Sequence, residues 1–242
     1  MSHLLLVRHG QASFLEPDYD KLSQKGEAQS RLLGEYWGAH RIAFDRVYSG
    51  PRVRQRETER LAREAYRKSG MRWPEVEVLD QFDEFRAEAV MEQSLPKLVG
   101  SDAHIFELHR AFQAAAGKDE KFKTFQKIFE VVIARWARGE LPVEGIEPWP
   151  EFCTRVRAGL ARLTGNGSRG QRIVIFTSGG PVGVAIAGSL AARRRRVVPA
   201  AQLSGRTEDL SKAPTNQRKS GSLRREVQYV VRQQVLDPLS AL

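Results

Sequence analysis

The chain has 242 residues, 41% of them hydrophobic, which is typical of one globular domain with an appendage. Its single cysteine, Cys153, excludes an intrachain disulfide and a zinc site built from cysteines, and favours a reducing, cytoplasmic setting. The net charge of +10 is uneven: residues 191–242 hold eleven Arg or Lys against four Asp or Glu (+7), so the charge does not mark the whole protein as a nucleic-acid binder.

The first predicted element is a short buried strand. Residues 4–7 are a continuous apolar run bounded by polar residues, which is typical of a strand in a parallel sheet. The run is too short for a signal peptide or a membrane span, and no later segment reaches that length. We therefore expect no membrane-spanning segment.

The following elements alternate between helix and strand. Residues 22–39 have apolar side chains at helical spacing, and Ser23 is placed to cap the start of this helix. Residues 44–49 predict a second strand, residues 53–68 a highly charged helix, and residues 76–79 a third strand.

The middle of the chain is predicted to be helical. Residues 85–139 have a helical pattern, with breaks expected near Pro96, Gly100 and Gly117. The apolar stripe between residues 122 and 136 is expected to pack on the sheet or on a neighbouring helix and not to hold a cofactor. Residues 145–150 predict a loop and residues 151–163 another helix.

The most clearly predicted strand is residues 172–177, which continue through Ser178, Gly179 and Gly180 into an apolar helix over residues 182–192. The order of elements indicates an α/β fold: a three-layer αβα sandwich with a mostly parallel sheet, right-handed crossovers and a helical insertion at about 85–148. We expect this domain to span residues 1–190.

Residues 191–242 are expected to form a basic, disordered tail, in which only residues 227–236 could make a short strand or helix. An altered reading frame late in the gene would also produce such an end.

Polar residues follow each predicted strand. Because ligands bind beyond the carboxyl ends of parallel strands, these residues are expected to converge on one rim of the sheet. An arginine offers a fixed fork for phosphate oxygens, a neutral imidazole is a competent nucleophile, and Gly10 lets a ligand approach the backbone. The pair Arg8 and His9 therefore predicts a phosphate site, with His9 as the candidate nucleophile.

Three motifs, in this order, resemble those of the histidine phosphatase superfamily, the phosphoglycerate-mutase-like proteins. They are LVRHGQAS at residues 6–13, LSQKGEAQ at residues 22–29 and SGPRVRQRET at residues 49–58. The resemblance covers about residues 4–188.

The resemblance implies a mechanism. His9 would attack phosphorus and form a phosphohistidine, while Arg8 and Arg54 would hold the phosphoryl oxygens. Gly10 and Ser13 would also contact the phosphate. The family needs no metal, and we expect no metal and no cofactor here.

Other charged residues are expected to have no role in the site. Arg52 and Arg56 are expected on a solvated helix face. The remaining histidines lack metal-binding spacing and are expected at the surface or in caps: His3, His40, His104 and His109.

Two positions depart from the family pattern. Ser178 stands where the family usually has a second histidine; its hydroxyl and the Gly179 amide could still donate to phosphate, but without a positive charge. Gln81 aligns with the family's proton-donating glutamate and cannot protonate a leaving oxygen. Asp83 and Glu84 are the preferred replacements for the general acid.

The sequence therefore predicts a phosphomonoester hydrolase, or less readily a mutase, that acts through His9 with weak or altered activity. The alternative is a non-catalytic relative that binds a phosphate ligand. The expected partner is a small phosphorylated molecule, and contact with nucleic acid or an acidic surface is expected only through the basic tail.

Overall fold

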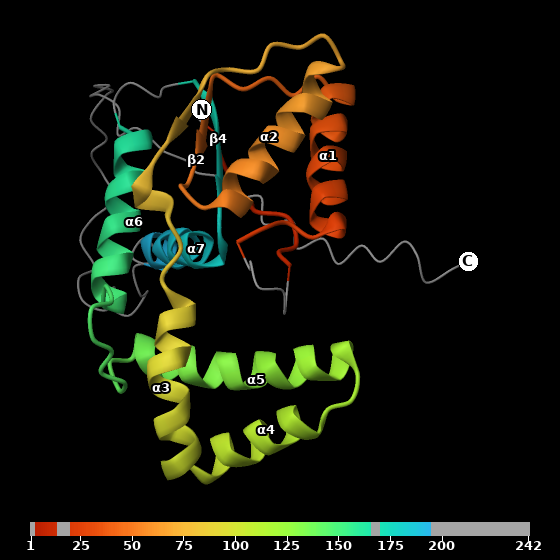
Figure 1. The fold of residues 1–242 in the computed structure, drawn as a ribbon. Helices are drawn as coiled ribbons and strands as arrows, with labels where there is room; N and C mark the ends of the chain where they lie inside the picture. The colour runs from red at the N-terminus through yellow and green to blue at the C-terminus, as the bar shows by residue number, and fades with distance from the viewer. Residues whose placement is uncertain (1–2, 14–19, 166–169, 195–242) are drawn as a thin grey trace, which may run out of the picture.

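The chain folds around one parallel sheet in the computed structural model, which describes residues 3–13, 20–165 and 170–194 (Figure 1). In the described part, the strands follow the spatial order β1-β4-β2-β3. Every neighbouring pair of strands is parallel, as the sequence predicted. The strands are β1 (His3–Arg8), β2 (Arg46–Ser49), β3 (Val76–Val78) and β4 (Arg172–Thr177).

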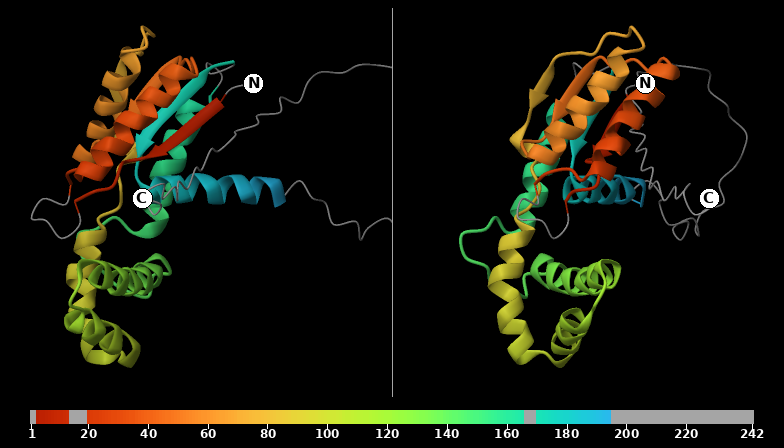
Figure 2. Two further views of the ribbon diagram at one scale, coloured as in Figure 1. Left: turned by 90° about the vertical axis from the view of Figure 1, so that its right-hand side faces the viewer. Right: turned by 45° about the vertical axis from the view of Figure 1, so that its right-hand side comes forward.

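Helices cover both faces of the sheet, and the result is an αβα sandwich (Figures 1 and 2). Successive side chains of a strand point to opposite faces, so the apolar strands β1 and β4 supply two cores. Leu4, Leu6, Ile173 and Ile175 belong to the core beside α6 (Trp149–Leu163) and α7 (Gly179–Arg194). Val174 and Phe176 belong to the other core, beside α1 (Gln24–Ala39) and α2 (Val53–Arg67).

Helices α1 and α2 lie side by side on one face of the sheet (Figure 1). Ser23 caps α1 as predicted, because its side chain accepts a hydrogen bond from the backbone N–H of Gly26 at 3.1 Å. The two helices meet at Gly34, where a Cβ would lie 2.0 Å from the carbonyl oxygen of Ala62. A glycine is therefore required for this approach.

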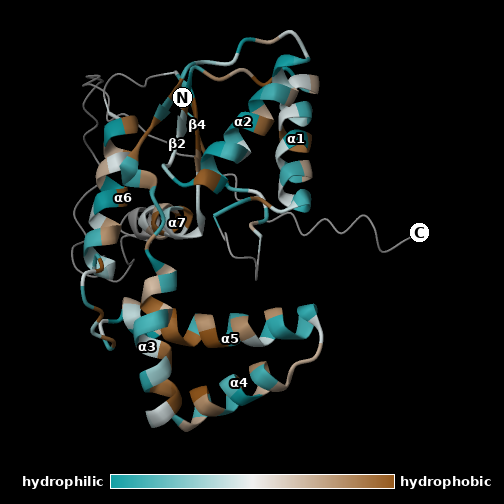
Figure 3. Cartoon of the chain, viewed as in Figure 1, coloured by the Kyte–Doolittle hydropathy of each residue, from teal (hydrophilic) through white to brown (hydrophobic). Residues whose placement is uncertain are grey.

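The helical insertion forms an arm beside the sandwich, made of α3 (Ala87–Ser101), α4 (Ala103–Ala114) and α5 (Lys118–Ala137) (Figure 1). In Figure 3, hydrophobic and hydrophilic residues alternate along α4 and α5, as expected of helices with one buried side. The arm has its own core, which includes Val90, Ile105, Ile128, Val132 and Trp136. The apolar stripe predicted between residues 122 and 136 therefore packs between helices.

The break expected near Pro96 and Gly100 is wrong, because α3 continues through both residues to Ser101. Pro96 lies on the exposed side of the helix, as does Glu92, whose carbonyl would have accepted the missing hydrogen bond. Water can reach that carbonyl, so the proline costs less than it would in a buried turn. Two other helices start earlier than predicted, α6 at Trp149 and α7 at Gly179.

Within the part of the chain that the structure describes, no helix combines the length and the apolar character needed to cross a membrane. Most of the predicted basic tail, residues 195–242, lies outside the described residues. Residues 14–19 of the loop after His9 lie outside them as well.

Candidate active site

The segments that follow the strands lie side by side at one rim of the sheet. The backbone N–H of His9 donates to the Thr177 carbonyl at 2.8 Å, and that of Gly50 donates to the Phe176 carbonyl at 2.9 Å. These bonds extend the β1–β4 and β2–β4 pairings past the ends of the strands. The predicted convergence of the strand ends is therefore present.

The loop after β1 is held by motif residues that carry no chemistry of their own. A Cβ on Gly10 would lie 2.4 Å from the carbonyl oxygen of Gly26, so these two backbones touch. The N–H of Gly10 donates to Thr58 Oγ1 at 3.0 Å, and the N–H of Gln11 donates to Gln29 Oε1 at 3.0 Å. Residues from the second and third motifs thus fix the position of His9.

His9 is held as a neutral ring whose unprotonated nitrogen is Nε2. Its Nδ1 lies 2.7 Å from the Gly10 carbonyl oxygen, which can only accept, so Nδ1 carries the proton. Nε2 then has the lone pair, and Arg54 Nε donates to it at 3.2 Å. Burial, together with the positive charges of Arg54 and Arg8, lowers the pKa of His9 to about 4.

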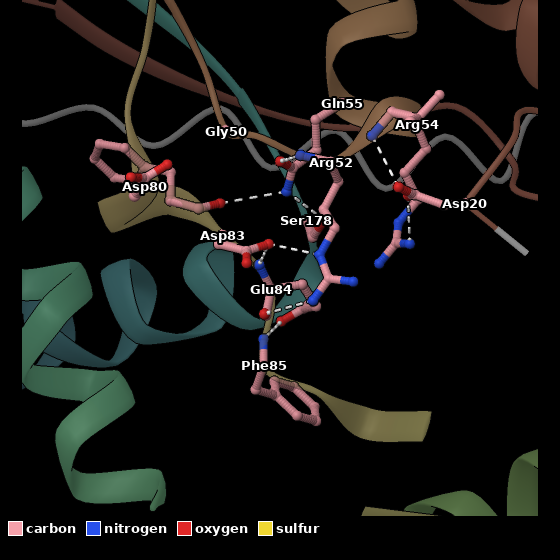
Figure 4. Close-up of polar contacts among 12 residues, drawn as sticks. Asp20, Gly50, Arg52, Arg54, Gln55, Asp80, Asp83, Glu84, Phe85 and Ser178 are labelled. Atoms are coloured by element: carbon pink, nitrogen blue, oxygen red, sulfur yellow. Dashed lines mark hydrogen bonds and ion pairs between the residues drawn. The ribbon is translucent and has the colours of Figure 1, made fainter. Parts of the chain in front are cut away.

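Arg54 is buried, with a side chain only 4% exposed, and it connects His9 to Asp20. Its NH1 lies 2.8 Å from Asp20 Oδ1, and the other oxygen of Asp20 accepts from the Val53 N–H at 2.9 Å (Figure 4). The sequence predicts for Asp20 only a place in the loop after His9. The signal that could have identified it is its position two residues before the second motif, which begins at Leu22.

Glu84 lies with Arg8 and the start of α7. Its Oε2 accepts from the Gly180 N–H at 3.0 Å, and its Oε1 accepts from the Phe85 N–H at 3.1 Å. A Cβ on Gly180 would lie 2.1 Å from Oε1, so only glycine admits this carboxyl group. Burial raises the pKa of Glu84, although both backbone hydrogen bonds and the charges of Arg54 and Arg8 act in the opposite direction.

Asp83, the other candidate acid, is turned to a different partner. Its Oδ1 lies 2.6 Å from Arg52 Nε, and NH2 of the same guanidinium donates to the Glu84 carbonyl at 3.2 Å. The expectation that Arg52 lies on a solvated helix face is wrong, since its side chain is only 23% exposed. Arg56 is exposed, as expected.

Ser178 is fully buried, and its Oγ accepts from Gln55 Nε2 at 2.7 Å (Figure 4). The serine that replaces the second histidine thus faces the interior beside Gln55, a residue that sequence reasoning did not single out. Gly179, in contrast, is exposed, and the guanidinium carbon of Arg8 lies 3.9 Å from the position of a Cβ on it. Gln81 packs against Gly159 of α6, and Ser13 is buried.

Across residues 3–13, 20–165 and 170–194, no group of three or more His, Cys, Asp or Glu side chains is arranged to hold a metal ion. The Nδ1 of His40 lies 2.8 Å from the Tyr36 carbonyl oxygen at the end of α1, which is a capping contact.

The chain is similar to one known family and to several solved structures. The family model described as histidine phosphatase superfamily (branch 1) matches residues 4–140. A solved phosphoglycerate mutase from Bacillus anthracis is 19% identical with a TM-score of 0.51, covering 78% of this chain and 80% of that one. A candidate alpha-ribazole-5'-P phosphatase from Escherichia coli is 21% identical with a TM-score of 0.50, covering 76% of this chain and 77% of that one. No curated protein sequence matches.

Proposed function

The chain belongs to the histidine phosphatase superfamily, and from this premise we propose that it hydrolyses phosphomonoesters through a phosphohistidine intermediate on His9. The observation that carries the proposal is the state of His9: Nδ1 is bonded to the Gly10 carbonyl and the ring is neutral, so Nε2 holds the lone pair that attacks phosphorus once a bound phosphoryl group replaces it as the partner of Arg54. Arg8 and Arg54 supply the positive charge that a phosphoryl group requires.

In the first step, His9 Nε2 attacks phosphorus as the bond between phosphorus and the ester oxygen breaks. The leaving oxygen takes the proton of the Glu84 carboxyl group, which the raised pKa of Glu84 keeps available. The imidazole ring becomes positively charged, and its Nδ1–H remains bonded to the Gly10 carbonyl.

In the second step, water attacks the phosphohistidine. The Glu84 carboxylate takes a proton from that water, the bond between phosphorus and Nε2 breaks, and His9 leaves as the neutral ring. Inorganic phosphate is released, and Glu84 is protonated again for the next cycle.

Trapping the intermediate tests the proposal. Wild-type protein mixed briefly with a labelled phosphomonoester should form an acid-labile, alkali-stable adduct with about one phosphate per chain, and His9→Ala should form none. His40→Ala, which alters an exposed histidine in a capping contact, is the matched control and should label like wild type. Equal labelling of wild type and His9→Ala would refute the mechanism.

A second candidate function is phosphate binding without turnover. The observation that favours it is the position of Ser178, which is buried against Gln55 and brings no second cation to the phosphate. Losing one charge-stabilising donor typically costs about 10²–10³ in rate, so this replacement favours a slow enzyme or a binding protein. Wild type that binds inorganic phosphate but hydrolyses neither aryl nor alkyl phosphates would support this alternative.

We also propose a small phosphorylated molecule as the substrate and a cytoplasmic setting. The buried, unpaired thiol of Cys153 is compatible with a reducing compartment.

A further inference from the structure

We propose that Arg52, the N-cap of α2, and Gln55, in its first turn, are positioning residues that brace the segment carrying Glu84 against the phosphate-binding end of the same helix. Both residues lie within the third motif, and their side chains bond to the segment before and around Glu84 and to Ser178. The catalytic meaning of this brace rests on the proposed function, in which Glu84 moves the proton. The geometry of the brace stands independently of it.

Gln55 connects three strand-end segments through one buried amide. Its Oε1 accepts from the Arg52 N–H at 3.1 Å, and its Nε2 donates to the Phe82 carbonyl at 3.3 Å and to Ser178 Oγ at 2.7 Å. The residue is fully buried, so water cannot replace these partners. The amide therefore fixes the start of α2 relative to the segment before Glu84 and to the end of β4.

Arg52 extends the same connection to the next two residues. Its guanidinium bonds the Asp83 carboxylate through Nε at 2.6 Å and the Glu84 carbonyl through NH2 at 3.2 Å (Figure 4). A planar fork that holds two acceptors fixes both direction and distance. Asp83 in turn accepts from the Glu84 N–H at 2.7 Å, so the backbone of Glu84 is held from both sides.

The opposite side of this segment is already fixed by other elements. Thr177 Oγ1 donates to the Phe82 carbonyl at 2.8 Å, and NH1 of Arg155 in α6 donates to the carbonyls of Asp80, Gln81 and Asp83 at 2.8–3.3 Å. Arg52 and Gln55 hold the side of this segment that faces α2. Because Arg52 is the N-cap of α2 and Arg54 lies only two residues further along the chain, the brace sets the distance between the phosphate-binding guanidinium and the Glu84 carboxyl group.

The direction in which removal of Arg52 shifts the pKa of Glu84 depends on whether Arg52 acts as a charge or as a positioning residue. The charged groups that act on Glu84 are Arg8 of β1, Arg54 of α2 and Arg155 of α6, with Asp83 beside it in sequence. If Arg52 acted as one more positive charge, its loss would raise the pKa of Glu84. If Arg52 holds Glu84 in its buried position, its loss exposes the carboxyl group to water and lowers the pKa of Glu84 towards its ordinary value.

The kinetic experiment compares Arg52→Met with wild type on two esters, p-nitrophenyl phosphate and ethyl phosphate. The nitrophenolate leaves without help, whereas the ethoxide needs a proton, so misplacing the acid slows phosphoryl transfer to His9 from the second ester only. This step is read from kcat/KM, because kcat also contains the hydrolysis of the phosphohistidine, in which Glu84 takes a proton from water with either ester. We expect kcat/KM for ethyl phosphate to fall about tenfold or more, and kcat/KM for p-nitrophenyl phosphate to fall less than about threefold. An equal loss on both esters would overturn the brace.

The matched control is Arg60→Met, which removes an arginine of the same helix whose ion pairs are with Glu57 and Glu64. It should leave both rates unchanged. Gln55→Leu has nearly the same volume and should give the same split between the two esters as Arg52→Met.

A titration of the Glu84 carboxyl carbon by NMR gives a second readout that needs no turnover. Arg52→Met should lower the pKa of Glu84 relative to wild type and Arg60→Met, and an unchanged or raised value would overturn the brace. If wild type hydrolyses neither ester, the proposed function fails, while this titration still decides whether Arg52 positions Glu84.

Discussion

His9 and Glu84 are shifted in opposite directions by the same buried surroundings. Burial lowers the pKa of His9 to about 4 and raises the pKa of Glu84, so both shifts favour the uncharged form of the side chain. A neutral nucleophile next to a protonated acid is the state that the first catalytic step requires.

We therefore expect kcat/KM to be greatest on the acid side of neutrality. Activity should fall towards pH 4 as His9 gains a proton, and fall at higher pH as Glu84 loses its proton. In Glu84→Gln, the part of the alkaline decline that belongs to Glu84 should vanish, and the rate on ethyl phosphate should drop about 10²–10⁴-fold. pH–rate profiles of both proteins on the same ester measure these effects.

The second ionisation of the substrate, near pH 6, is common to all variants, so the difference between profiles isolates Glu84. The control is Glu88→Gln, which alters an exposed carboxylate in the first turn of α3. If the loss of activity at high pH is identical in wild type and Glu84→Gln, the group that titrates there is not Glu84.

At the scale of elements, the contact between α1 and α2 requires a glycine at position 34, and this requirement can be tested. Gly34→Ala places a methyl group 2.0 Å from the Ala62 carbonyl oxygen, so the two helices must separate. We expect the free energy of unfolding to fall by about 1–3 kcal/mol, as measured by urea denaturation.

Gly100→Ala in α3 is the matched control, because a Cβ there meets nothing within 4 Å. It should leave stability unchanged or raise it by up to about 1 kcal/mol, since alanine is the better helix former. A Gly34→Ala variant as stable as this control would contradict the close approach of α1 and α2.

The elements and the rim of the sheet could be predicted because their signals are local. Continuous apolar runs marked β1 and β4, and polar residues directly after them marked the site. The partners of those residues could not be predicted in the same way. Gln55 and Ser178 are 123 positions apart, so the burial of Ser178 follows only from three-dimensional packing. The ion pair of Arg52 with Asp83 likewise joins distant segments.

Glu84 was one of two adjacent carboxylates that the sequence proposed for the acid, and the sequence alone could not choose between them. The two carboxylates point in different directions. Glu84 bonds to the Gly180 N–H and lies near Arg8 and Arg54. Asp83 bonds to Arg52. Only the backbone path after β3 determines which of the two enters the site.

At the scale of the whole molecule, the charge distribution predicts a separable function of the C-terminal region. A chain truncated after Arg194 retains every described element but loses half of the net positive charge, because residues 195–242 carry nine Arg or Lys against four Asp or Glu (+5 of +10). We expect the full chain to bind duplex DNA weakly, with an affinity that falls steeply as salt rises, and the truncated chain to lose this binding. Fluorescence anisotropy at several salt concentrations measures it.

Phosphate affinity serves as the control in this comparison, because the residues around His9 precede the truncation. DNA binding that survives the truncation with the same salt dependence would place the contact elsewhere on the molecule.

The parallel direction of every strand has an electrostatic consequence. The helices that follow β2 and β4 both begin at the rim where His9 lies, and neither α2 nor α7 has an acidic residue in its first turn. Each helix start contributes the positive end of a macrodipole, equivalent to about half an elementary charge. The two dipoles therefore add a positive field that belongs to the backbone, and replacing Arg8 or Arg54 singly would weaken the attraction of the rim for anions without removing it.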